Sequence, residues 1–130
     1  MHRALKNLGP LVGPDTMLVS TQNGVEGPEF IAAQFGEQHT VAGVVGVLSY
    51  IESPGVIRKH SAGTVTVGEF YTSAEEPSAR VVALVEALVA AGVDARASTT
   101  IKETMWTKLT GAPPRWGLAG DSTHSRHVLL

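Results

Sequence analysis

The chain has 130 residues, of which 43% are hydrophobic and 17% are charged, and it carries no cysteine. Ten basic against twelve acidic side chains give a formal net charge of −2, which argues against nucleic acid as the main partner. The lack of cysteine excludes disulfides and a thiolate nucleophile, and no apolar run approaches the ~20 residues that span a membrane. These values predict a soluble, cytoplasmic protein that is one domain or a piece of a larger one.

The first part of the chain has the pattern of a strand, a turn and a helix. The apolar run 16–21 has the length of a strand, and Asn23 and Gly24 follow it as turn residues that tolerate positive φ. A helix is expected over 28–35, and Gly36 suits the position after its end. Because this order is half of a βαβ unit, it predicts a parallel sheet and an α/β fold.

The middle of the chain is rich in valine and predicts further strands. The segment 41–51 is expected to be one strand, and its continuous apolar first half predicts burial on both faces. After a turn at 53–55, the segments 56–60 and 64–70 are expected to be antiparallel partners, with residues 62–63 between them.

Two helices and a short strand are expected after residue 76. The helix over 77–91 is amphipathic, and 93–97 is expected to be a strand. The stripe expected to be buried consists of Val81, Leu84, Val85 and Leu88. Thr100 with Glu103 forms a capping-box pattern, which predicts a last helix that continues to about residue 109.

Several catalytic and nucleotide-binding motifs are absent from the sequence. None of the 14 glycines has another glycine two residues on, so the Gly-x-Gly-x-x-Gly dinucleotide loop is missing. No lysine follows a glycine as a Walker A loop requires, and no Gly-x-Ser-x-Gly elbow occurs. His124 and His127 are three residues apart but lack a third ligand, so no metal site is expected.

Asn23 is a candidate ligand-binding residue because of where it follows its strand. In open α/β sheets, ligands bind outside the carboxyl ends of the strands, and Asn23 lies just beyond the end of the segment 16–21. Its amide could therefore reach a ligand. The alternative is that Asn23 serves only as a turn residue.

Lys108 is a candidate general acid because it interrupts an apolar helical stripe. At 100° per residue it shares one sector of the last helix with Ile101, Met105 and Leu109, which are expected to face the core. Burial of an ammonium lowers its pKa and makes it a usable proton donor near neutral pH. The alternative is a last-turn lysine that complements the helix dipole, and Trp106 is expected to anchor the core.

Four motifs, taken in order and spacing, resemble one enzyme family over about residues 1–110. They are Thr21-Gln22-Asn23-Gly24-Val25, Ser53-Pro54-Gly55-Val56, the segment 64–68 and Trp106-Thr107-Lys108-Leu109. Together they resemble ketopantoate reductase (2-dehydropantoate 2-reductase). The resemblance implies an α/β fold made of the second half of a Rossmann-like NAD(P)-binding domain plus the first helix of an all-α C-terminal domain.

The resemblance also implies a division of the chain. Residues 1–98 would form a partial Rossmann-like domain without the Gly-rich amino-terminal unit, and 99–110 would begin the helical domain. Residues 111–130 depart from the family, because Ala112 stands where the family has an asparagine and two prolines follow it. This tail is expected to be irregular.

The implied function is NADPH-dependent reduction of ketopantoate to pantoate, a step in pantothenate and coenzyme A biosynthesis. By resemblance, Asn23 lies beside the nicotinamide and the substrate, and Lys108 is the catalytic general acid. Because the Gly-rich loop and the long helical domain are missing, the chain is expected to be a truncated fragment that is inactive or weakly active.

Two other functions stay open at this point. The chain could be a non-catalytic remnant or interaction module that buries an exposed sheet edge against another chain. It could also be a different hydride-transfer dehydrogenase of the same architecture, such as an opine or glycerol-phosphate dehydrogenase. A homo-oligomer and a complementing second chain are both compatible with the sequence.

Overall fold

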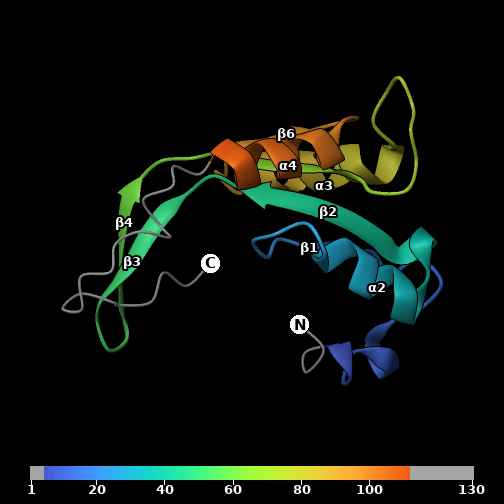
Figure 1. The fold of residues 1–130 in the computed structure, drawn as a ribbon, viewed down its shortest axis with the longest axis horizontal. Helices are drawn as coiled ribbons and strands as arrows, with labels where there is room; N and C mark the ends of the chain where they lie inside the picture. Colours follow the sequence, from blue (N-terminus) through green and yellow to red (C-terminus); the bar gives the residue numbers. More distant parts are fainter. Residues whose placement is uncertain (1–4, 112–130) are drawn as a thin grey trace.

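The computed structural model describes residues 5–111, which form a four-stranded mixed sheet, helices on both of its faces and a projecting two-stranded hairpin (Figure 1). The elements in chain order are η1 (Gly9–Leu11), β1 (Leu18–Ser20), α2 (Gly27–Phe35), η2 (Glu37–His39), β2 (Thr40–Val45), β3 (Leu48–Ser53), β4 (Val56–Ser61), β5 (Val65–Glu69), α3 (Ala79–Ala90), β6 (Ala95–Ala97) and α4 (Ile101–Gly111). The predictions for His124, His127 and the tail beyond Gly111 lie outside the described residues.

The segment from β1 to β2 is a parallel βαβ unit, as the sequence predicts. β1 and β2 pair in parallel with Val19 opposite Val41, and α2 forms the crossover between them. Pro28 stands in the first turn of α2, and Gly36 follows its end with a φ of 97°, a conformation that favours glycine. The predicted α/β class is therefore confirmed.

A second parallel crossover runs from β5 through α3 to β6. The strand order of the sheet is β1-β2-β5-β6, and the central pair, β2 with β5, is antiparallel. In α3 the side chain of Val81 is fully buried, and Leu84 and Val85 pack against the same cluster, which confirms the core of the predicted stripe. Ser78 caps the helix, because its hydroxyl accepts a hydrogen bond from the Val81 N–H.

Two strand predictions are wrong. The segment 41–51 is interrupted at residues 46–47, so that β2 and β3 are separate strands. β4 pairs with β3 and not with β5, because the tight turn at Pro54 and Gly55 (φ 81°) places two sequence neighbours side by side. Residues 62–64 then lead the chain from β4 into β5, which pairs with β2, and they do not form a turn between two paired strands.

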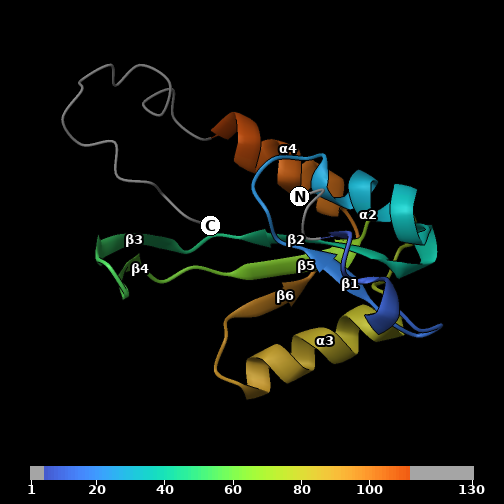
Figure 2. The same cartoon turned by 90° about the horizontal axis from the view of Figure 1, so that it is seen from below.

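The helices cover the two faces of the sheet unequally. α2 and α4 lie on one face and α3 lies on the other (Figure 2). Ala42 packs with residues of α4 on the first face, while its neighbour Val41 packs with Val81 of α3 on the second. Since both residues are completely buried, the predicted burial of this strand on both faces is confirmed.

The predicted place of Trp106 in the core is wrong, since its side chain is 55% exposed. Ile101 and Met105 face the sheet, and a residue one position beyond Met105 turns about 100° away from it. Leu109, predicted to lie in the core-facing stripe, is also 47% exposed. The buried stripe of α4 is therefore short.

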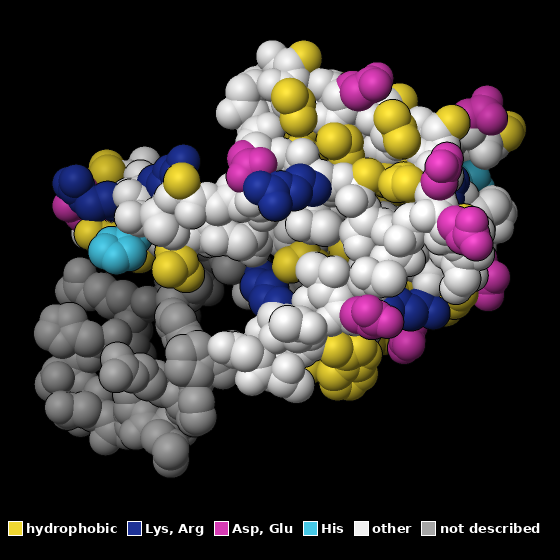
Figure 3. Space-filling view, turned by 90° about the horizontal axis from the view of Figure 1, so that it is seen from above, with side chains coloured by type: hydrophobic (Ala, Val, Ile, Leu, Met, Phe, Trp, Pro, Cys, Tyr) yellow, Lys and Arg dark blue, Asp and Glu magenta, His cyan; other side chains and the backbone are white. Residues whose placement is uncertain are grey.

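Basic and acidic side chains are mixed on the surface that Figure 3 shows. Lys and Arg side chains lie on the projecting hairpin, where β4 carries Arg58, Lys59 and His60, and they also lie among acidic side chains over the sheet and helices (Figure 3). Within residues 5–111 no helix is long and apolar enough to cross a membrane.

Glu69 joins the end of β5 to the start of α3. Its carboxylate accepts hydrogen bonds from Ser78 Oγ and Arg80 Nε, both at 2.6 Å, and Arg80 also donates to the Gln38 carbonyl. The hydrogen bond from Arg80 is the main cause that lowers the pKa of Glu69, against the opposing effect of burial. The hydrogen bonds of Glu69 and Arg80 therefore connect the end of β5, the start of α3 and the short helix η2.

We expect Glu69→Gln to lower the free energy of unfolding at pH 7 by about 1–2 kcal/mol, because Arg80 is partly exposed and solvent screens the pair. A carboxyl whose pKa is lowered on folding contributes stability above its unfolded pKa and loses it as the pH falls through the folded value. The difference between wild type and variant should therefore be full at pH 7 and shrink below pH 4.5. Urea denaturation followed by circular dichroism at pH 7 and pH 2.5 measures both values.

The matched control is Glu52→Gln, which removes the exposed ion pair between Glu52 and Arg58. This change should cost well under 1 kcal/mol at either pH. An equal loss for Glu69→Gln at both pH values would show that the ionised carboxylate contributes nothing to stability.

Candidate functional site

The structure brings together the two residues that the sequence singles out, although 85 positions separate them. Lys108 Nζ, from α4, donates a hydrogen bond to Asn23 Oδ1 at 2.8 Å. It donates a second, also at 2.8 Å, to the backbone carbonyl of Val45, the last residue of β2. The ammonium therefore joins the turn after β1, the end of β2 and the helix α4.

This arrangement decides which way the Asn23 amide faces. An ammonium has three donors and no acceptor, so the atom of Asn23 that it contacts must be the oxygen. The Asn23 NH2 group and the third N–H of Lys108 then remain as donors beyond these two bonds. Chemically, the pair presents hydrogen-bond donors, which suits a ligand that offers carbonyl or carboxylate oxygens.

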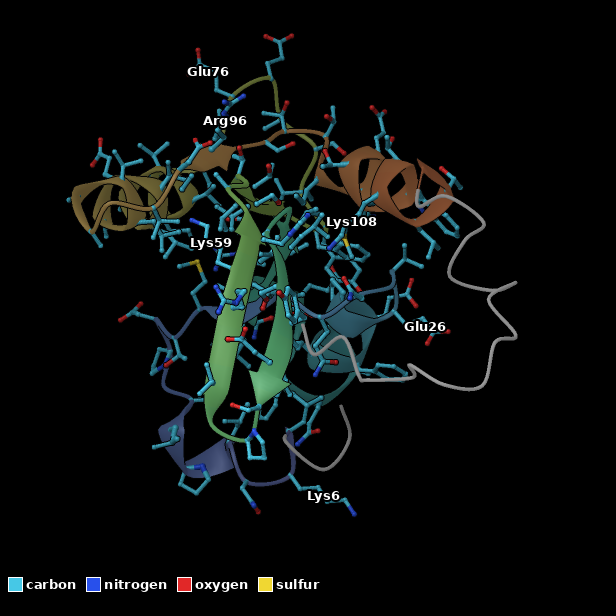
Figure 4. All side chains as sticks on the ribbon, turned by 90° about the vertical axis from the view of Figure 1, so that its left-hand side faces the viewer. Lys6, Glu26, Lys59, Glu76, Arg96 and Lys108 are labelled. Atoms are coloured by element: carbon cyan, nitrogen blue, oxygen red, sulfur yellow. The ribbon has the colours of Figure 1, made fainter. Side chains whose placement is uncertain are left out.

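Burial lowers the pKa of Lys108 below its ordinary value, and desolvation of the ammonium is the cause. Figure 4 shows Lys108 on the sheet side of α4, whereas Glu26 points away from it. A partly desolvated ammonium without a carboxylate partner is easier to deprotonate than one in water. The direction of this shift is the one that makes Lys108 a better proton donor than a lysine in water.

Glycines at two places allow the backbone to approach closely enough to form the site. Gly24 has a φ of 95° and turns the chain directly after Asn23. At Gly68 in β5, a Cβ would overlap the Ser98 carbonyl and lie 2.9 Å from Ile101 Cβ. The absence of a side chain at Gly68 thus lets α4 begin against the sheet, about two turns before Lys108.

A cavity of about 300 Å³ opens beside Asn23. Its lining residues come from the turn after β1, the start of α2 and the end of α4, and they are Gln22, Asn23, Gly24, Val25, Glu26, Gly27, Phe30 and Leu109. Phe30 and Leu109 supply apolar wall, and Asn23 supplies a polar group. The partial exposure of Leu109, unexpected from the sequence, is explained by its place in this wall.

These residues fit one end of a nicotinamide dinucleotide and not the other. A planar ring and a small acceptor ligand match a cavity with apolar walls and amide donors. The start of α2 does not match a pyrophosphate, because Glu26 and Glu29 stand at this helix end, where they repel an anion.

The sequence alone did not identify the Val45 carbonyl, which is one of the two acceptors that bind the Lys108 ammonium. Every residue has a backbone carbonyl, so no residue type could have marked this one. Within residues 5–111, no group of three or more His, Asp or Glu side chains is placed to hold a metal ion.

The family described as "Ketopantoate reductase PanE/ApbA" matches residues 1–71 of the chain. A 2-dehydropantoate 2-reductase of Mesorhizobium japonicum is 30% identical over 128 aligned positions, which cover 83% of this chain and 38% of that protein. The chain thus spans little more than a third of this relative.

Two solved structures of 2-dehydropantoate 2-reductases have the same fold. The protein from Geobacter metallireducens is 30% identical with a TM-score of 0.76, over 87% of this chain and 36% of that one. The protein from Methylococcus capsulatus is 27% identical with a TM-score of 0.73, over 89% and 37% of the two chains. The predicted Rossmann-like fold is therefore confirmed, while the predicted domain boundary after residue 98 stays a prediction.

Proposed function

The chain belongs to the ketopantoate reductase PanE/ApbA family, and on this premise we propose that it carries the proton-donating part of a 2-dehydropantoate 2-reductase site. In this proposal Lys108 is the general acid, and Asn23 binds the substrate and the nicotinamide of NADPH. The observation that supports it most directly is the 2.8 Å hydrogen bond between Lys108 Nζ and Asn23 Oδ1, beside the cavity that Asn23 lines.

The chemistry follows from the charge that develops on the substrate. NADPH, when bound, supplies a hydride to the carbonyl carbon of ketopantoate. As negative charge grows on the carbonyl oxygen, the Lys108 ammonium stabilises it and then transfers a proton, which leaves a neutral amine and the hydroxyl of pantoate. The lowered pKa of Lys108 favours this transfer, and solvent then returns a proton to the amine.

Asn23 has two tasks in this proposal. Its oxygen, together with the Val45 carbonyl, holds the ammonium in one position, so that less orientation is lost in the transition state. Its NH2 group is left to donate to the ligand in the cavity. We also propose a cytoplasmic location and a small 2-oxo acid as the substrate.

We expect the 130 residues on their own to show no detectable, or only weak, ketopantoate-dependent oxidation of NADPH. The physical reason is that the sequence has no Gly-x-Gly-x-x-Gly loop to hold the cofactor's pyrophosphate. The measurement is NADPH absorbance with the purified chain, run beside the Lys108→Ala variant.

The outcomes separate the competing functions. Weak turnover that Lys108→Ala removes would support the general-acid role, and turnover that survives this change would contradict it. The other candidate is a non-catalytic interaction module, which one observation favours: β1 is the last strand at its side of the sheet within residues 5–111. Tight NADPH binding in a fluorescence titration would argue against that module.

A further inference from the structure

The peptide unit that joins Val45 to Gly46 is held from both ends. Its oxygen accepts the hydrogen bond from Lys108 Nζ at 2.8 Å. Its N–H, which belongs to Gly46, donates to the Thr64 carbonyl at 3.0 Å. Because a peptide unit is planar, a rotation that breaks one of these bonds also displaces the other. The orientation of the carbonyl that holds Lys108 therefore depends on the backbone at residue 64.

Gly63 lies directly against the next peptide unit of the chain, which joins Gly46 to Val47 between β2 and β3. A Cβ at Gly63 would overlap the Gly46 carbonyl and lie 2.8 Å from the Val47 nitrogen. Both contacts are with backbone atoms, which cannot rotate aside as the end of a side chain can. A side chain at Gly63 would therefore have to push residues 46–47 away.

The conformation of Gly63 does not itself require a glycine. The glycines with positive φ in residues 5–111 are Gly24, Gly36, Gly55 and Gly92, and Gly63 is not among them. What residue 63 supplies is the absence of a side chain at the place where the segments 62–64 and 46–47 approach each other.

We propose that Gly63 is a positioning residue for Lys108: its missing side chain lets residues 62–64 lie against residues 46–47 and so aims the Val45 carbonyl at the ammonium. The proposal rests on the function proposed above, because it assigns Gly63 a part in holding the general acid. It connects the base of the β3–β4 hairpin to the proton donor on α4.

A purely structural role for Gly63 makes a different prediction. If this glycine only connects the hairpin to the sheet, a side chain there would alter the hairpin and leave Lys108 in place. The two roles are therefore distinguished by the state of the Lys108 amine and of the Val45 carbonyl.

The test is a pH titration of the isotope-labelled 130-residue chain by carbon-detected nuclear magnetic resonance. The Lys108 Cε signal, identified by its loss in Lys108→Met, reports the pKa of the amine. The correlation of the Val45 carbonyl carbon with the Gly46 nitrogen reports the acceptor. In the wild type we expect both signals to follow one titration below the ordinary lysine value of 10.5.

In Gly63→Ala we expect two changes. The Val45 signal should no longer follow the amine, and the pKa of Lys108 should rise towards 10.5, because the released ammonium moves into water. The matched control is Gly46→Ala, on the other strand of the same crossing, where the new Cβ would lie 3.4 Å from the Thr64 carbonyl in ordinary contact. This control keeps the N–H and should retain both wild-type titrations.

Three results would overturn the proposal. The first is a wild-type Val45 carbonyl that does not respond to the Lys108 titration. The second is a folded Gly63→Ala chain that retains both titrations. The third is a Gly63→Ala chain that stays unfolded even with a stabilising osmolyte such as trimethylamine N-oxide, since Gly63 would then serve the whole fold. None of these measurements needs NADPH or ketopantoate, so failure of the proposed function would not be confused with failure here.

Discussion

Lys108→Ala is expected to lower kcat by about 10²- to 10⁴-fold, the range that general acid catalysis contributes. Measuring a loss of this size requires a protein with full turnover. The protein for this test is a hybrid reductase. In it, residues 5–111 replace the matching segment of the Geobacter metallireducens enzyme, whose fold agrees over 87% of this chain. The assay is ketopantoate-dependent NADPH oxidation, measured over a range of pH.

The size of the effect follows from the position of the ammonium. Lys108 Nζ is held by two acceptors, Asn23 Oδ1 and the Val45 carbonyl, and it needs only its third N–H to reach a substrate oxygen. Alanine removes the proton donor and leaves both acceptors without their partner. Because the proton is needed only as charge develops on the substrate, the loss should appear in kcat more than in KM.

The control for the hybrid is Lys102→Ala, on the same helix. The Lys102 ammonium lies over the ring of Phe70, 4.5 Å from its centre, whereas the hydrogen bonds to Asn23 and Val45 come from Lys108. This variant should keep kcat within about tenfold of the parent. A folded hybrid without turnover while Lys108 is intact, or one in which Lys108→Ala keeps its kcat, would contradict the general-acid role.

Ile101→Ala is expected to lower the free energy of unfolding by about 2–5 kcal/mol, the usual cost of deleting a buried aliphatic side chain. Ile101 is 1% exposed and forms a cluster with Ala42, Phe70 and Met105, which holds α4 on the sheet. The space left behind cannot close easily, because the backbone of Gly68 already lies against this residue. Urea denaturation followed by circular dichroism measures the loss.

The matched control is Leu109→Ala, an aliphatic residue of the same helix that is 47% exposed. It should cost less than about 1 kcal/mol, since little of its apolar surface is removed from water. If the two substitutions cost the same, α4 would have to lie on the sheet with a different face, and the placement of Lys108 would be wrong.

The sequence predicted the local elements well because their signals are local. The parallel unit from β1 to β2 follows from a strand, a turn and a helix in succession, and the helix α3 follows from a stripe of apolar residues. Asn23 and Lys108 were also visible, since each is a polar residue at a conspicuous place in an element. Their functional roles remain predictions that the hybrid assay tests.

The errors came from features that depend on distant parts of the chain. The pattern of short strands predicts antiparallel pairing of 56–60 with 64–70, but the turn at Gly55 pairs β4 with β3 instead. The sequence predicts that Trp106 anchors the core, whereas α4 faces the sheet with Ile101 and Met105 and leaves Trp106 exposed. Residue type cannot reveal which strand or sheet will lie opposite.

By itself, the sequence determined the fold class, the order of most elements, the family and the two polar residues of the candidate site. Only the tertiary structure decided that Asn23 and Lys108 meet, that the Val45 carbonyl holds the same ammonium, and that Gly63 lies against residues 46–47, which follow this carbonyl. The physical reason is that backbone carbonyls and close backbone approaches carry no side-chain signal. Their role becomes visible only when folding brings residues 63 and 85 positions apart within hydrogen-bond distance.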